Sequence, residues 1–227
     1  MSPPSAVAPE LTSSLVNVPS LPNLAELDPS KLKVTITKNP RTYISDSSKI
    51  EWGKTDVCTD HWITAKWSDT HGWEAPELKP YGHIDLYPTS SCLHYATECF
   101  EGLKAYRGYD GSVRLFRPTR NTARMLMSST RIALPSFPPS ALEELIKTLI
   151  AHDAPKWLPE PGKFLYIRPT MIGTGSALGI QKPREAMLFI LAAQFPVLYE
   201  KPMKLFASRE GTIRAWPGGF GYAKVGA

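Results

Sequence analysis

The chain has 227 residues, of which 42% are hydrophobic and 10% aromatic, and this suffices for one large or two small domains with a buried core. Its 26 basic and 21 acidic side chains give a formal net charge of +5 but are interspersed, which argues against a nucleic-acid partner. No apolar run reaches the roughly 18 residues that a membrane span requires, so we expect no membrane association.

The first 30 residues, rich in Pro, Ser, Ala, Leu and Asn, have no periodicity, and we expect residues 1–30 to form a disordered tail. They carry neither a secretory signal nor the arginines of a mitochondrial presequence. We therefore expect a cytoplasmic location, and the sequence leaves a mitochondrial form open. Cys58, Cys92 and Cys99 lack the spacing of a metal site, so we expect reduced, mostly buried thiols and no metal.

Short strands are predicted at Lys33–Thr37 and His61–Trp67, where β-branched and aromatic residues gather. The stretch SSCLHYATECFEG, residues 90–102, suggests a helix with Ser90 or Ser91 as N-cap and Gly102 beyond its end. In LKAYRGYDGSVRLF, residues 103–116, two β-rich runs flank an Asp-Gly pair, which predicts a β-hairpin because the turn needs positive φ.

Two longer helices are predicted next, at residues 119–132 and 140–152. In the second, the apolar residues Leu142, Leu145, Ile146, Leu149 and Ile150 form a single stripe. Ser140 and Glu143 are spaced for a capping box, and Pro155 is expected to end this helix.

Three further strands are predicted at Lys163–Ile172, Ala186–Phe195 and Met203–Ser208. The middle one is apolar on both sides, as a central strand would be, so we expect a sheet buried on both faces. Strands, helices and strands in this order predict an α+β layer architecture.

Several residues could carry chemistry, each against a plainer alternative. Lys224 lies in a glycine-rich turn after the apolar segment IRAWPGG, where a desolvated amine could form a Schiff base, although most lysines are surface charges. Tyr166 and Arg168 share one face of a strand and could read a carboxylate, or simply lie at the surface. Arg124 could bind an anion or be an ordinary exposed helix charge, and Tyr95 and Phe100 are expected on different sides of one helix.

Taken together, the segments LHYATECFEGLKAYRG, VRLFRPTRNTARML, RIALPSF, LYIRP and IRAWPGGFGYAKVGA resemble the branched-chain aminotransferases, nearest to fungal members. These are fold type IV enzymes that use pyridoxal 5'-phosphate. The resemblance implies a small N-terminal α+β domain at residues 31–198. It also implies a linker and the start of the cofactor-binding domain at residues 199–227, with the first strand and lysine turn of that domain.

The resemblance also implies a role for each candidate residue. Lys224 matches the lysine that holds the cofactor and moves the proton of the α-carbon, and Arg124 the arginine that binds the cofactor phosphate. Phe100, Tyr166 and Arg168 match the substrate pocket, where Arg168 also recognises the second carboxylate of glutamate. Tyr95 and Ile180 match positions that reach into the pocket of the neighbouring subunit of a homodimer. The implied reaction passes the amino group of leucine, isoleucine or valine to 2-oxoglutarate.

Members of the family continue well past the position that Ala227 matches, so we expect the 227 residues alone to have little or no activity. Two alternatives stay open. The chain could be a non-catalytic dimerisation or regulatory paralogue, or a specialised aminotransferase for another amino acid, since Val225 and Ala227 replace the usual residues of the lysine turn.

Overall fold

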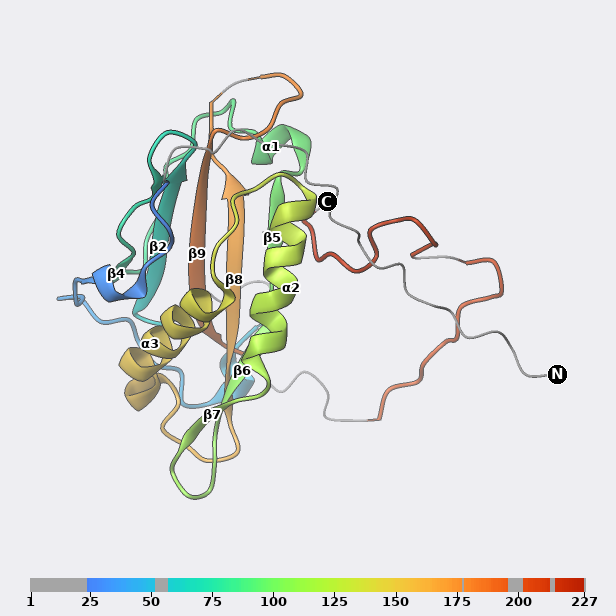
Figure 1. The fold of residues 1–227 in the computed structure, drawn as a ribbon. Coiled ribbons are helices and arrows are strands. Elements are labelled where there is room, and N and C mark those ends of the chain that lie inside the picture. Colours follow the sequence, from blue (N-terminus) through green and yellow to red (C-terminus); the bar gives the residue numbers. More distant parts are fainter. Residues whose placement is uncertain (1–23, 52–56, 177, 196–201, 213–214, 227) are drawn as a thin grey trace.

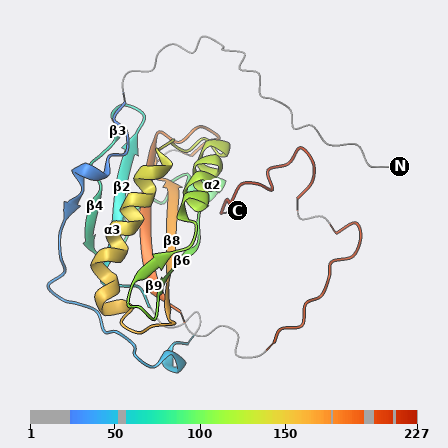
Figure 2. The same ribbon diagram turned by 60° about the horizontal axis from the view of Figure 1, so that its bottom comes forward.

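The computed structural model describes residues 24–51, 57–176, 178–195, 202–212 and 215–226. Its centre is one mixed sheet, and the two long helices both lie on the same face of that sheet (Figures 1 and 2). The α+β class predicted from the order of elements is confirmed. Residues 1–23 of the expected tail, and the first residues of the expected linker, lie outside the described ranges.

The long strands of the sheet run antiparallel, in the order β1-β4-β2-β9-β8-β6-β7, with β3 pairing β2 and β5 pairing β8. Only the short pair of β1 with β4 is parallel among the strands described. The strands are β1 Lys33–Val34, β2 His61–Ser68, β3 Gly72–Trp73, β4 Glu77–Pro80, β5 Glu98–Phe100, β6 Leu103–Arg107, β7 Val113–Leu115, β8 Phe164–Gly173 and β9 Glu185–Gln194.

The helices are α1 Cys92–Tyr95, α2 Pro118–Arg131 and α3 Pro139–Trp157, with short 3-10 turns at Pro29–Lys31 and Ser47–Lys49. The apolar stripe of α3 faces the sheet as predicted, since every residue of it is at most 4% exposed. Burying each such leucine or isoleucine contributes about 1.5–3 kcal/mol. The stripe therefore anchors α3 to the strands it contacts, β2, β8 and β9.

The predicted ends of α3 are wrong. Pro138 occupies the N-cap and no side chain caps the helix there, so Ser140 and Glu143 form no capping box. Pro155 lies inside the helix, which continues to Trp157. A proline within a helix removes one backbone hydrogen bond, which destabilises the helix. In α3, burial of Ala154 and Trp157 in the core offsets this loss and holds the last turn in place.

In the part of the chain that the structure describes, the long helices α2 and α3 cover one face of the sheet only (Figures 1 and 2), which corrects the expectation of a sheet buried on both faces. In β9, Ala186, Leu188, Ile190 and Ala192 are at most 1% exposed beneath the helices. On the opposite face, Met187 is 7% exposed, and Phe189, Leu191 and Ala193 are half-buried. The helix-free face therefore remains accessible between the strands and the loops beside it.

The remaining predictions of strands and helices are only partly confirmed. The hairpin of β6 and β7 is confirmed, with Gly111 in its turn at φ 79°. Residues 90–102 form only the single turn α1 before Ala96, at φ 51°, redirects the chain into β5. The predicted strand at Lys33–Thr37 is limited to β1, and Met203–Ser208 is exposed and has no strand partner among the described residues.

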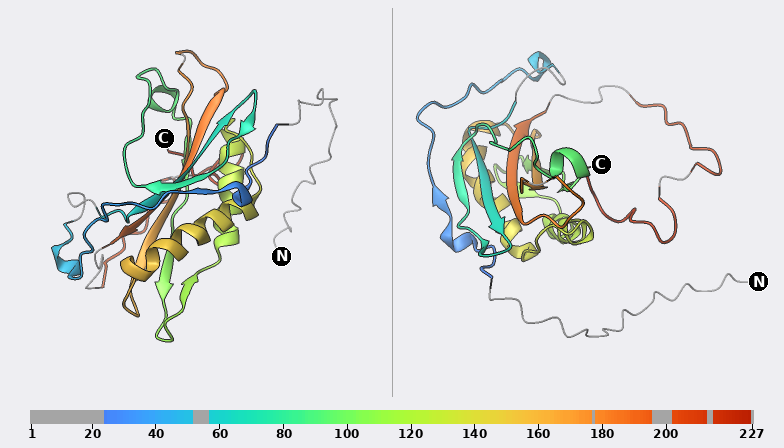
Figure 3. Two further views of the ribbon diagram at one scale, coloured as in Figure 1. Left: turned by 90° about the vertical axis from the view of Figure 1, so that its left-hand side faces the viewer. Right: turned by 90° about the horizontal axis from the view of Figure 1, so that it is seen from above.

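Residues 24–31, which the sequence analysis assigned largely to the tail, contact the sheet. Ala25 forms a bridge with Gly72, and the Leu27 side chain is 2% exposed in the core. A side chain on Gly72 would collide with the backbone of Ala25, so only glycine permits this close approach. At the other end, residues 202–212 extend away from the sheet, and the last residues of the segment 215–226 return to β5 (Figure 3).

Buried carboxylates also join α3 to the sheet. Asp60 accepts hydrogen bonds from Lys156 Nζ at 2.7 Å and Trp157 Nε1 at 2.8 Å, both on α3, and from the Arg41 N–H at 2.6 Å. Burial by itself raises the pKa of Asp60, but these hydrogen bonds outweigh it and hold the pKa below 3.8. Asp153 of α3 contacts His61 Nδ1 at 2.7 Å.

We predict that Asp60→Asn lowers the free energy of unfolding at pH 7 by about 1–3 kcal/mol, because the charged acceptor of α3 is lost. The stabilisation is present above pH 3.8 and is lost as the pH falls through the lowered pKa. Urea denaturation at pH 7 and pH 3 measures it, with Asp69→Asn, at an exposed pair with Arg184, as control. A wild-type midpoint in Asp60→Asn at pH 7 would contradict this prediction.

Candidate active site

β5 and β6 pair with β8 in one continuous register, although they are separate strands. Phe100 pairs with Thr170 and Leu103 with Ile167, so residues 101 and 102 keep their places along β8. Because side chains alternate along a strand, Phe100 belongs to the helix-free face and Glu101 points to the face covered by α2. Gly102 then lies on the same face as Phe100.

Tyr166 and Arg168 project together from β8, as the sequence predicted. Arg168 donates to the Tyr166 hydroxyl from Nη2 at 2.9 Å and from Nε at 3.2 Å. Leu165 and Ile167, on the opposite face, are 0% exposed. A side chain on Gly102 would collide with the Tyr166 hydroxyl, so the missing side chain at this position makes room for the phenol.

Lys224 lies on the outer edge of β5. Val225, the next residue, forms an antiparallel bridge with Cys99. The Lys224 carbonyl accepts a hydrogen bond from the Phe100 N–H at 3.2 Å. The Lys224 amine lies 4.1 Å from the centroid of the Phe100 ring, and the Arg168 guanidinium carbon lies 4.5 Å from the same centroid. The ring therefore attracts two cations at once.

The charge of this cluster favours an anion. No ion pair of the described residues gives Arg168 or Lys224 a carboxylate partner. A guanidinium and an amine that contact one aromatic ring, beside a phenol, can together bind the carboxylate of a ligand.

Arg124 is held by a buried carboxylate that sequence reasoning did not single out. Glu101, 0% exposed, accepts from Arg124 Nε at 2.5 Å and Nη2 at 2.7 Å, and from Asn121 Nδ2 at 2.9 Å. These bonds raise the pKa of the Arg124 guanidinium, although its partial burial acts in the opposite direction. The Arg124 side chain remains 46% exposed, so it is fixed on α2 while part of it faces solvent.

In the described part of the chain, Tyr95 and Ile180 make no hydrogen bond to the cluster at Phe100, and Tyr95 bonds the residue before Ile180. Tyr95 lies at the end of α1, and its hydroxyl accepts from the Gly179 N–H at 2.9 Å. The Ile180 side chain is 98% exposed. The expectation that Tyr95 and Phe100 share a helix is wrong, since Phe100 belongs to β5.

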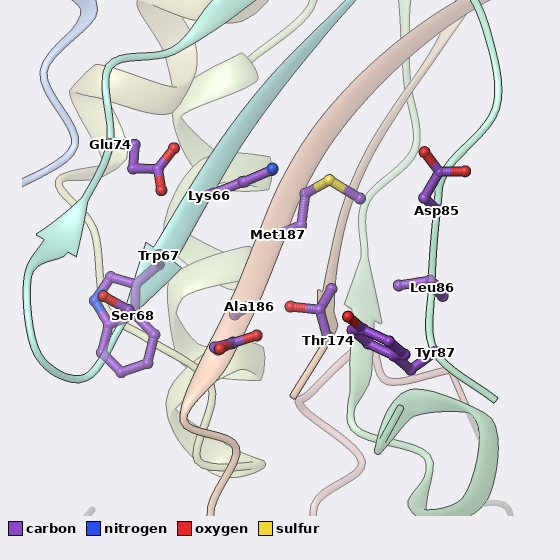
Figure 4. Close-up of a pocket in the computed structure, with 11 residues that line it drawn as sticks. Lys66, Trp67, Ser68, Glu74, Asp85, Leu86, Tyr87, Thr174, Ala186 and Met187 are labelled. Atoms are coloured by element: carbon purple, nitrogen blue, oxygen red, sulfur yellow. The ribbon is translucent and has the colours of Figure 1, made fainter. Parts of the chain in front are cut away.

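Two pockets lie near these elements. One, of about 250 Å³, is lined by Ala215, Trp216, Gly219, Phe220, Gly221, Ala223, Lys224 and Val225. The other, of about 340 Å³, opens over β2 and β9, where Lys66 and Met187 face Asp85 and Tyr87 (Figure 4). None of the predicted site residues lines this second pocket, so we place the candidate site at Lys224.

Other chemistry finds little support. In the described ranges, no group of three His, Cys, Asp or Glu side chains could hold a metal ion. Cys92 and Cys99 are free thiols. Burial, with the nearby Glu101 and Glu98, raises the pKa of Cys99 to about 12, which keeps that thiol protonated. No helix in the part of the chain that the structure describes has the length and apolarity to cross a membrane.

The chain is similar in sequence to curated proteins of one kind. No family model matches the chain. The mitochondrial branched-chain-amino-acid aminotransferase of Schizosaccharomyces pombe is 42% identical over 217 residues, 94% of this chain and 50% of that protein. The cytosolic enzyme of that name from Saccharomyces cerevisiae is 44% identical over 209 residues, 90% of this chain and 54% of that protein.

Among solved structures, the branched-chain aminotransferase of the thermophilic archaeon Thermoproteus uzoniensis, solved with norvaline, is 21% identical at a TM-score of 0.45. That match covers 59% of this chain and 41% of the other. A further branched-chain amino acid aminotransferase, complexed with N-(5'-phosphopyridoxyl)-L-glutamate, is 24% identical at a TM-score of 0.44. This match covers 58% of the present chain and 40% of the other chain.

The fold and the cluster define an α+β protein with two cationic side chains against one aromatic ring on one face of its sheet. Two curated relatives of one name are more than 40% identical to this chain over most of its length. The chain is a homologue of the branched-chain-amino-acid aminotransferases, which confirms the resemblance found in its motifs. It spans about half the length of the curated relatives it matches.

We predict that Glu101→Gln lowers the free energy of unfolding by about 2–4 kcal/mol, because the amide leaves the guanidinium of Arg124 without its buried counter-charge. Denaturant unfolding of the variant and the wild type measures the loss. Asp110→Asn is the matched control, since it breaks an exposed two-point pair with Arg114 and should leave stability nearly unchanged. Equal stability of the two variants would show that burial adds nothing to the Glu101 pair.

Proposed function

We propose that the protein is a pyridoxal-phosphate-dependent branched-chain aminotransferase. It passes the amino group of leucine, isoleucine or valine to 2-oxoglutarate, giving branched 2-oxo acids and glutamate. The observation that carries this proposal is the meeting of Lys224, Phe100 and Arg168 at one ring, in a chain homologous to enzymes of that name.

The residues present fit the cofactor. Lys224 supplies an amine at a pocket, and the Phe100 ring that it contacts is also contacted by the Arg168 guanidinium. The partly exposed guanidinium of Arg124, which Glu101 orients, suits a phosphate. When bound, the cofactor supplies an electron sink for the α-carbon of the amino acid.

The chain's own residues then divide the work. Lys224 Nζ holds the cofactor and moves the proton of the substrate α-carbon. Arg168, oriented by the Tyr166 hydroxyl, binds the second carboxylate of glutamate or 2-oxoglutarate. The Phe100 ring offers an apolar wall to a branched side chain and excludes water from the amine. The same pocket must therefore accept either the apolar side chain of a branched-chain substrate or the acidic side chain of glutamate.

We propose a homodimer in which Tyr95 and Ile180 reach the neighbouring subunit's pocket. The exposed Ile180 and the hydrogen bond that fixes Tyr95 to the same loop support this role. The curated relatives include both cytosolic and mitochondrial proteins, and we propose the cytoplasm for this one.

A non-catalytic dimerisation module is the second candidate. The observation that favours it is the exposed apolar surface on α1 and the loop after β8, where Leu93 is 58% and Leu178 is 64% exposed. Such a module would form dimers without taking up the cofactor.

We predict that borohydride reduction in the presence of pyridoxal phosphate labels the wild type at Lys224 and that Lys224→Arg, which keeps the charge but cannot form the imine, abolishes this label. Peptide mass spectrometry locates the label. Lys204→Arg, at another lysine of the same C-terminal segment, should leave the label at Lys224 unchanged.

Equal labelling of many lysines, with no preference for Lys224, would contradict the proposed function. Labelling at Lys224 combined with glutamate formation from phenylalanine but not from leucine would favour a specialised aminotransferase. A dimer that takes up no label would favour the dimerisation module.

A further inference from the structure

The backbone of Lys224 is held by α2 as well as by the sheet. In a regular antiparallel pair, the residue opposite Phe100 would accept from the Phe100 N–H and donate its own N–H to the Phe100 carbonyl. Lys224 does accept from Phe100, but its N–H donates instead to the Ser128 hydroxyl oxygen, at 2.8 Å. At Lys224, therefore, a hydrogen bond to α2 replaces the second hydrogen bond of the strand pair.

Ser128 is built to serve as this acceptor. Its side chain is 0% exposed, and its hydroxyl donates to the Arg124 carbonyl one turn earlier in α2, at 2.9 Å. A serine hydroxyl has one hydrogen to donate, so its lone pairs remain free to accept the Lys224 N–H. The same hydroxyl thus joins the turn that carries Arg124 to the backbone of Lys224.

This bond matters because the end of the chain has few other attachments. Residues 202–212 are exposed, and the hydrogen bonds of the described C-terminal segment to the sheet are those of Lys224 and Gly226 with β5. The Gly226 N–H donates to the Glu98 carbonyl at 2.9 Å. A lysine on so short a pairing needs a further contact to hold its amine over the Phe100 ring.

We propose that Ser128 is a positioning residue: its hydroxyl fixes the backbone of Lys224, and thereby the Lys224 amine, at a set place relative to Arg124 on the same helix. The inference rests on the proposed function for the role of Lys224. It goes beyond that function by naming the group that sets the spacing between the amine and the phosphate-binding guanidinium.

Ser129 provides a matched control. It is also 0% exposed on α2, and its hydroxyl likewise donates to a backbone carbonyl of the preceding turn, that of Leu126, at 2.9 Å. Ser129 has no bond to Lys224. Ser128→Ala and Ser129→Ala therefore remove the same group from the same buried helix, and only the first removes the acceptor of the Lys224 N–H.

The first measurement is amide hydrogen exchange of the whole chain without cofactor. We expect the Lys224 amide to exchange about tenfold faster or more in Ser128→Ala, with wild-type rates in β8 and β9 and in Ser129→Ala. Ser128→Thr, which keeps the hydroxyl, should restore protection. A wild-type exchange rate at Lys224 in Ser128→Ala overturns the proposal.

The second measurement is the fraction of Lys224 labelled by a limiting amount of pyridoxal phosphate and borohydride. We expect this fraction to fall several-fold in Ser128→Ala and to stay at the wild-type level in Ser129→Ala. Faster exchange with unchanged labelling would mean that the bond is only structural, which also overturns the proposal. Absence of label in the wild type would instead reject the proposed function, while the exchange rates still test the bond.

If Ser128→Ala does not fold, Ser128→Cys takes its place in both measurements, because sulfur keeps most of the volume and is a weak acceptor. We expect the same direction of change in that variant. Wild-type exchange at the Lys224 amide of Ser128→Cys overturns the proposal.

Discussion

The single register in which residues 98–107 pair with β8 is the constraint on which the site depends. Alternation along that line sends the Phe100 ring to the helix-free face and the Glu101 carboxylate to α2, and it leaves the bare backbone of Gly102 beside the Tyr166 hydroxyl. A slip by one residue would place the carboxylate beside Tyr166 and Arg168 and the ring beneath the helix. The three neighbouring residues therefore perform distinct tasks only because their pairing is fixed.

Buried carboxylates connect this sheet to its helices. Asp60 accepts from two side chains of α3, and Glu101 from two side chains of α2. Such pairs stabilise a fold only while both partners are present, since an unpaired buried charge is costly. They fix where each helix lies along the sheet, which apolar contacts alone specify less sharply. For α2 this placement has chemical consequences, because that helix carries Arg124 and, one turn later, Ser128.

The helix-free face gathers the reactive groups. Lys224 reaches it from the far end of the chain, Arg168 and Tyr166 from β8, and Phe100 from β5. Glu101 holds the Arg124 guanidinium on α2 through a side-chain hydrogen bond. An aromatic ring contacted by two cations, with a phenol beside them, combines an apolar surface with positive charge, and a carboxylate ligand could bind there.

By itself, the sequence determined the features that depend on local periodicity: the β6–β7 hairpin, the buried stripe of α3, and the shared face of Tyr166 and Arg168. It also supplied the motifs that led to the family. Only the tertiary structure decided that residues 98–100 form a strand, that α3 passes through Pro155, and that Met203–Ser208 does not pair in the described chain. It also decided that Glu101 holds Arg124 and Ser128 holds Lys224. These outcomes rest on partners tens of residues away, and a local pattern carries no information about which distant group will satisfy a buried hydrogen bond or cover a strand.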